Sequence, residues 1–111
     1  MPRKQLETLC DLATEAHTRI QTNFSDIDPI VGVSQSMRKS GVPADAMTID
    51  CLRTMRRIII VLHDESLEIL NYQFAFRDKD PSGDFKQLPF DQLSAELIYQ
   101  WMSDYFSQSQ Q

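Results

Sequence analysis

The sequence predicts an α+β domain with a β-hairpin at its centre. Residues 56–63 are rich in β-branched side chains on both faces, as in a strand that is covered on both sides. Residues 68–77 alternate apolar and polar side chains, which is typical of a strand with one covered face. Amphipathic patterns on either side of the hairpin indicate the helices that cover it.

Three helices are expected before the hairpin. Residues 3–24 place apolar side chains every three or four positions, which predicts a long amphipathic helix. A shorter helix is expected over 29–41, with Asp28 as its N-cap and Gly41 as its left-handed stop. Helical spacing over 43–55 predicts a third helix, and one longer helix that continues into the apolar run is the alternative.

The last element is predicted to be an amphipathic helix over residues 91–106, with Asp91 as its N-cap. Its aromatic side chains lie on one face, so this helix is expected to cover the apolar face of the second strand. That face consists of Leu70, Tyr72, Phe74 and Phe76.

The first strand of the hairpin needs a hydrogen-bonding partner on its other side, because a two-stranded sheet is marginal in water. Pairing with the same strand of a second copy would give a four-stranded antiparallel sheet in a homodimer. The expected dimer interface consists of Ile58, Ile59, Ile60, Val61 and Leu62.

Length and composition indicate one acidic globular domain over 1–106 and a disordered polar tail over 107–111. The net charge of −5 argues against a nucleic-acid binder. The sequence has neither a secretory signal nor an apolar run long enough to span a bilayer, so a cytoplasmic protein that does not bind membranes is expected. Cys10 and Cys51 lack a CxxC spacing and are interpreted as small core residues in a reducing compartment.

Two segments are candidate ligand sites. Arg56, Arg57 and Arg77 lie where the two strands pair, and they could bind an anion such as a phosphate or an acidic peptide. The alternative is that nearby carboxylates neutralise these arginines. The second segment resembles the first half of an EF-hand calcium loop, although position 12 is Pro89 instead of glutamate. Its candidate calcium ligands are Asp78, Asp80, Ser82 and Asp84.

Catalytic and other metal sites receive little support from the sequence. His63 neighbours Asp64 and Glu65, but adjacent residues in a turn point in different directions, and His17 is the only other histidine. No catalytic triad or phosphate-binding loop is found.

The leading functional expectation is therefore a small non-enzymatic interaction module, adaptor-like or chaperone-like, that forms a homodimer and binds an unidentified protein without a cofactor. The alternative is a regulatory protein that binds an anion or calcium. An active site assembled across a dimer interface stays open as a third interpretation.

Overall fold

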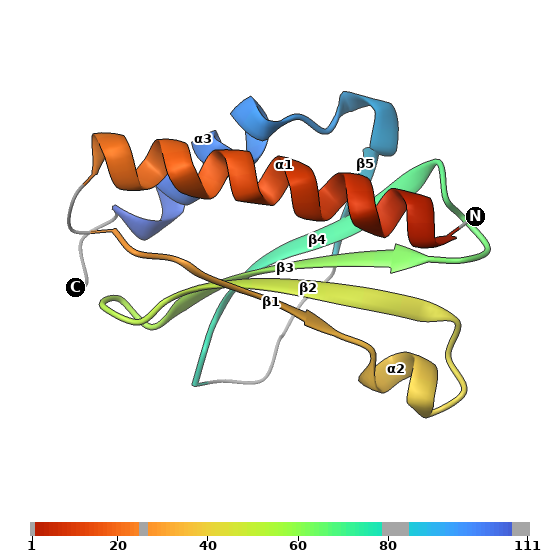
Figure 1. Cartoon of the computed structure of the whole chain (residues 1–111). Helices are drawn as coiled ribbons and strands as arrows, with labels where there is room; N and C mark the ends of the chain where they lie inside the picture. Colours follow the sequence, from red (N-terminus) through yellow and green to blue (C-terminus); the bar gives the residue numbers. More distant parts are fainter. Residues whose placement is uncertain (1, 25–26, 79–84, 108–111) are drawn as a thin grey trace.

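A computed structural model describes residues 2–24, 27–78 and 85–107 of the chain. Five antiparallel strands form one sheet in the order β1-β2-β3-β4-β5, and helices α1 and α3 lie on the same face of it (Figure 1). The elements are α1 (Pro2–Asn23), β1 (Ile30–Ser34), α2 (Ser36–Lys39), β2 (Ala44–Cys51), β3 (Arg56–His63), β4 (Ile69–Phe76), β5 (Lys86–Pro89), a 3-10 turn η1 (Phe90–Gln92) and α3 (Ala95–Phe106).

Strand β3 lies in the middle of the sheet and is buried on both faces. Ile60 pairs with Met47 of β2 on one side and with Tyr72 of β4 on the other. Because side chains alternate along a strand, one set points towards α1 and α3 and the other towards the opposite face. The helix side holds Ile58, Ile60 and Leu62, and the opposite side holds Ile59 and Val61, which pack with Ala44 and Ala75.

The hairpin, the first helix and the last helix are confirmed. The predicted strands 56–63 and 68–77 correspond to β3 and β4, and the predicted helix 3–24 corresponds to α1. Helix α3 ends at Phe106 as expected, but Asp91 is not its N-cap because it lies in η1. The cap is Ser94, whose hydroxyl accepts a hydrogen bond from the Leu97 N–H at 3.0 Å.

The predicted second and third helices are wrong. Most of the segment over 29–41 is strand β1 with the single-turn helix α2 after it, and the segment over 43–55 is mainly strand β2. Met47, Ile49 and Cys51 all point into the helix-covered core, which is the period-2 alternation of a strand. Gly41 does adopt the expected left-handed conformation, with φ 94°, two residues after the short helix.

The four-stranded dimer sheet was inferred from a free edge on β3, and that premise is wrong. Strand β2 of the same chain pairs with β3 along its full length, from Ala44 opposite His63 to Cys51 opposite Arg56. The residues expected in the dimer interface, 58–62, are therefore core residues between two neighbouring strands. The two outer strands of the sheet are instead β1 and β5.

Helix α3 covers Tyr72 and Phe74 of β4 with aromatic rings, as the sequence predicts, but Phe76 at the end of the expected face is 42% exposed. Trp101 stacks on Tyr72 with ring centroids 4.5 Å apart, and it meets Phe74 edge-on at 6.0 Å. The Tyr105 hydroxyl donates a hydrogen bond to the Ala75 carbonyl at 2.6 Å. Burial raises the pKa of this phenol, so the hydroxyl stays a donor.

Among the helices of the described segments, none combines the length and the apolar character that a membrane crossing requires.

Ile60→Ala tests the central position of β3. The side chain is fully buried, so its truncation is expected to lower the free energy of unfolding by about 2–5 kcal/mol. Val33→Ala on the outer strand β1 is the matched control, and its cost is expected to stay below about 1 kcal/mol. Urea denaturation measures both, and equal losses would contradict the assignment of centre and edge.

Candidate interaction edge

The two outer strands of the sheet differ in how well they are protected against pairing with another chain. Edge strands expose unpaired backbone groups, and proteins commonly protect them with lysine, proline or short length. Strand β5 has four residues and contains both Lys86 and Pro89. Strand β1, with the sequence Ile-Val-Gly-Val-Ser, contains neither lysine nor proline.

Strand β1 also exposes large aliphatic side chains. Ile30 is 50% exposed, Val31 37% and Val33 45%. Within the described part of the chain, β1 pairs with β2 alone, in the register Ile30 opposite Asp50 to Ser34 opposite Ala46. The outer side of β1 therefore combines unpaired backbone with apolar side chains, which is the condition for adding a further strand.

The start of β1 is fixed to α1 by two side-chain hydrogen bonds. His17 Nε2 donates to the Pro29 carbonyl at 2.8 Å, and Gln21 Nε2 donates to Asp28 Oδ1 at 2.7 Å. Ile27, just before this segment, is buried in the main core. These contacts give His17 a structural role and hold β1 beside the helix.

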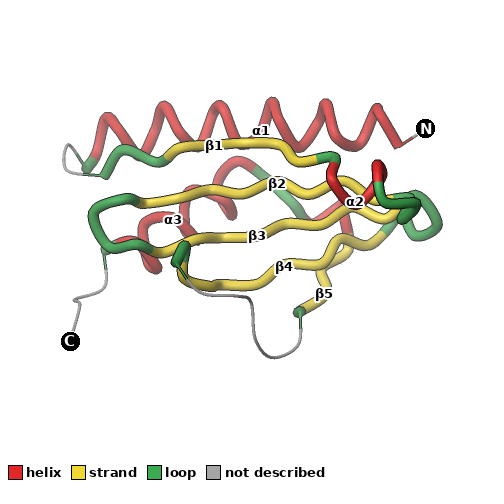
Figure 2. Tube along the Cα trace, turned by 90° about the horizontal axis from the view of Figure 1, so that it is seen from below, coloured by secondary structure: helices red, strands yellow, loops and turns green. Residues whose placement is uncertain are grey.

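Helix α1 lies beyond β1 when the sheet is seen face-on (Figure 2). Leu6 and Cys10 share a helix face with His17, because residues three, four and seven apart lie on one side of a helix. Both are half-buried. Burial and the neighbouring carboxylates of Asp11 and Glu7 raise the pKa of the Cys10 thiol, so the thiol stays protonated at neutral pH.

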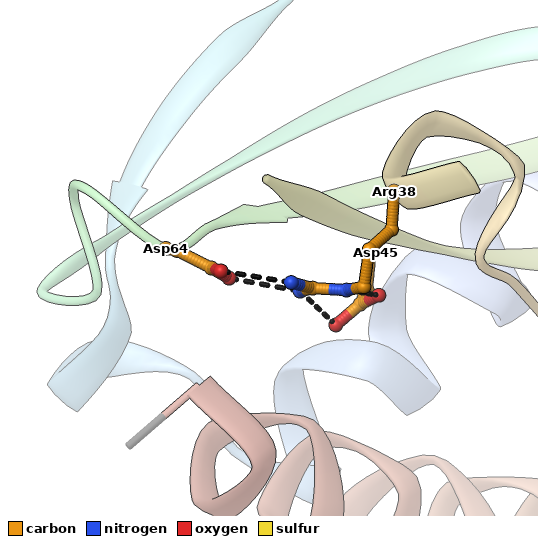
Figure 3. A network of polar contacts seen from close by, with 3 residues as sticks. All are labelled: Arg38, Asp45 and Asp64. Atoms are coloured by element: carbon orange, nitrogen blue, oxygen red, sulfur yellow. Dashed lines mark hydrogen bonds and ion pairs between the residues drawn. The ribbon is translucent and has the colours of Figure 1, made fainter. Parts of the chain in front are cut away.

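The other end of β1 leads into α2, which a network around Arg38 fixes to the sheet (Figure 3). Arg38 donates to both oxygens of Asp45 at 3.0 and 2.9 Å and to both oxygens of Asp64 at 2.9 Å. Asp45 belongs to β2 and Asp64 follows β3. The Arg38 hydrogen bonds lower the pKa of Asp64, so this carboxylate is ionised at neutral pH.

Two of the three arginines expected to bind an anion converge on one carboxylate, and the third lies apart from them. Arg57 Nε and Nη2 donate to Asp50 at 2.7 and 2.9 Å, and Arg77 Nε donates to the same carboxylate at 3.2 Å. Arg56 alternates with Arg57 along β3, and it donates from Nη1 to the Tyr105 carbonyl at 3.1 Å. Asp50 therefore forms ion pairs with both Arg57 and Arg77. For these two arginines, the structure matches the alternative in which nearby carboxylates pair with them.

The expected calcium ligands cannot be compared with the structure as a set. Asp78 is described, but Asp80, Ser82 and Asp84 lie outside the described residues. Within the described residues, no group of three or more histidine, cysteine, aspartate or glutamate side chains is close enough to hold a metal ion.

His63 lines a cavity of about 310 Å³ at the end of the sheet, with Val42, Pro43, Glu65 and Ser66. Asp64, the neighbouring acid, is bound by Arg38. Cys10 and Cys51 are both free thiols, and Cys51 is buried in the main core.

The sequence analysis missed the β1 edge because it assigned residues 30–34 to a helix. The signal was present, since three of these five residues are β-branched and apolar. A comparison of the chain with known protein families, with curated proteins and with solved structures gives no significant match.

Asp50→Asn tests the ion pairs by their pH dependence. Burial of the Asp50 carboxyl raises its pKa, but the hydrogen bonds and charges of Arg57 and Arg77 outweigh burial and lower it overall. A depressed folded pKa contributes stability above the unfolded value of about 3.9, and this contribution is lost as the pH falls through the folded value. The variant is expected to be less stable at neutral pH and to lose less stability on acidification.

Urea midpoints at a series of pH values from neutral to acid measure this difference. Asp91→Asn, at an exposed carboxylate of η1, is the control and is expected to follow the unmodified chain. The urea midpoint is plotted against pH for Asp50→Asn and for the unmodified chain. If the two plots stay parallel over the whole pH range, the ion-pair assignment is contradicted.

Proposed function

We propose that this chain is a non-enzymatic protein-interaction module that binds an extended segment of a partner protein along strand β1. The observation that carries the proposal is the contrast between the two edges of the sheet. Lysine and proline protect β5, whereas β1 exposes Ile30, Val31 and Val33 beside unpaired backbone.

An added strand would bind through two kinds of contact. Its backbone would pair with the outer side of β1, and its alternate side chains would meet the two faces of the edge. On the helix side these contacts are Val31 and Val33. On the other side they are Ile30 and Ser34. The partner is therefore expected to carry aliphatic side chains at alternate positions.

The position of α1 favours a single extended segment over a second copy of the chain. Because α1 lies beyond β1 in Figure 2, a second copy paired through β1 in a continuous sheet would bring its own α1 into the same space. A bare strand carries no such helix. It would fit beside β1 and beneath α1, so one of its faces would be covered without an additional element.

The charge of the protein supports a partner with basic residues next to its apolar segment. The chain carries a net charge of −5, and the exposed carboxylates of Asp11, Glu15 and Asp28 lie on α1 and just before β1. Complementary charge accelerates association and orients the partner. The binding area of one strand is small, so a reversible interaction is expected.

The alternative, a regulator that binds an anion on Arg56, Arg57 and Arg77, has less support because Asp50 already pairs with two of these side chains and offsets one of their two charges. A cytoplasmic location is part of the proposal. Calcium binding is not part of it.

Photo-cross-linking at two valine positions tests the proposal. A photoreactive amino acid replaces either Val33 on β1 or Val42, which is 42% exposed but lies outside the sheet. In cells of the source organism, the probe at 33 is expected to give a discrete product with another protein, and the probe at 42 is expected to give none.

A second substitution, Val31→Glu, is expected to abolish the product at 33, because it places a charge on the same face of the edge. Circular dichroism checks that this variant is folded. Products of equal yield at 33 and 42 would contradict a specific edge. A cross-linked product made of two copies of the chain would contradict an extended partner and would show that the β1 edge binds a second copy.

A further inference from the structure

A cavity of about 200 Å³ lies between α3 and β4, on the helix side of the sheet and separate from the β1 edge. It is lined by Phe74 of β4 and by Trp101, Asp104 and Tyr105 of α3. Asp104 and Tyr105 lie three and four positions after Trp101, so each neighbours Trp101 on the helix surface. Three aromatic rings and one carboxylate thus line a small open space.

Trp101 and Tyr105 meet Phe74 at different angles. Trp101 meets Phe74 at 85° with centroids 6.0 Å apart, and Tyr105 meets Phe74 at 42° with centroids 5.1 Å apart. Phe74 therefore lies between the two α3 rings. Trp101 is held in place by stacking on Tyr72, so this wall of the cavity is rigid.

We propose that this cavity binds a quaternary ammonium group. Aromatic ring faces attract cations, and cages of such rings are the usual protein sites for trimethylated ammonium groups. The Asp104 side chain is exposed at the cavity and supplies the compensating negative charge. Two sources share this chemistry, namely a choline-like small molecule and a trimethylated lysine side chain.

A quaternary ammonium group suits this lining better than a primary one. A primary ammonium is strongly hydrated and needs acceptors for three N–H groups. The cavity lining offers one carboxylate and three rings, and the Tyr105 hydroxyl already donates to Ala75. A trimethylated group has no N–H donors, so its methyl groups can contact the rings without an unpaired polar atom.

Arg56 limits the affinity of the cavity for a cation. Its guanidinium lies 5.0 Å from the centroid of the Tyr105 ring and 5.8 Å from that of Phe76. One of the three rings therefore already interacts with a cation, and the positive charge of Arg56 opposes a second one. Trp101, Phe74 and Asp104 are left to provide most of the attraction, which predicts weak binding in the millimolar range.

Trp101 is the only tryptophan of the chain, so its fluorescence reports directly on the cavity. Choline, tetramethylammonium and trimethyllysine amide are titrated, with the neutral isostere 3,3-dimethylbutan-1-ol as the control. The cations are expected to change the emission saturably, and the neutral isostere is expected to bind about tenfold more weakly. Tighter binding of trimethyllysine amide than of choline would assign the site to a modified protein, and the reverse order to a small molecule.

Asp104→Asn is expected to weaken the binding of tetramethylammonium about fivefold. The matched control is Asp91→Asn, at another exposed carboxylate that does not line the cavity, and it is expected to leave binding unchanged. Both positions are exposed, and the unchanged fluorescence of the free proteins checks the fold. Equal binding of the neutral isostere, or equal binding by both variants and the unmodified chain, would overturn the proposal.

Discussion

The pairing of β3 on both sides is the constraint on which the rest of the structure depends. A strand that is apolar on both faces must be covered above and below and must also satisfy its backbone on both sides. Helices α1 and α3 cover one face, and β2 and β4 supply the backbone partners. Once β3 is central, the remaining antiparallel pairings place β1 and β5 at the two edges of the sheet.

The two edges then acquire different properties from their own residues. Lys86 and Pro89 on β5 discourage further pairing, whereas β1 has only small and aliphatic residues. The contacts of His17 and Gln21 at one end of β1 and of Arg38 at the other fix the strand in place without covering its outer side. Because the edge is already ordered, little conformational entropy is lost when a partner binds to it. Its exposure therefore supports a binding role.

The sequence predicts the elements for which either the spacing or the residue type decides between helix and strand. Residues 58–62 continue the helical spacing of 43–55, but their isoleucine and valine side chains favour a strand, and the alternation over 70–76 fits a strand. Residues 44–51 satisfy both periods, since Met47 and Cys51 are four apart as in a helix while Met47, Ile49 and Cys51 alternate as in a strand. These residues form a strand because β3 needs a hydrogen-bonding partner along its other side. That requirement comes from the tertiary structure and cannot be read from the local spacing of apolar residues. The candidate edge was missed for the same reason, because β1 exists only as the neighbour of β2.

Backbone amide exchange, measured residue by residue by NMR on the isolated chain, tests the central claim that β1 is an open edge. If β1 pairs on one side only, every second amide of residues 30–34 is expected to exchange rapidly, while the amides of β3 exchange only through global unfolding. Uniform protection along β1, comparable with that of β3, would mean that the edge is covered and would contradict the account.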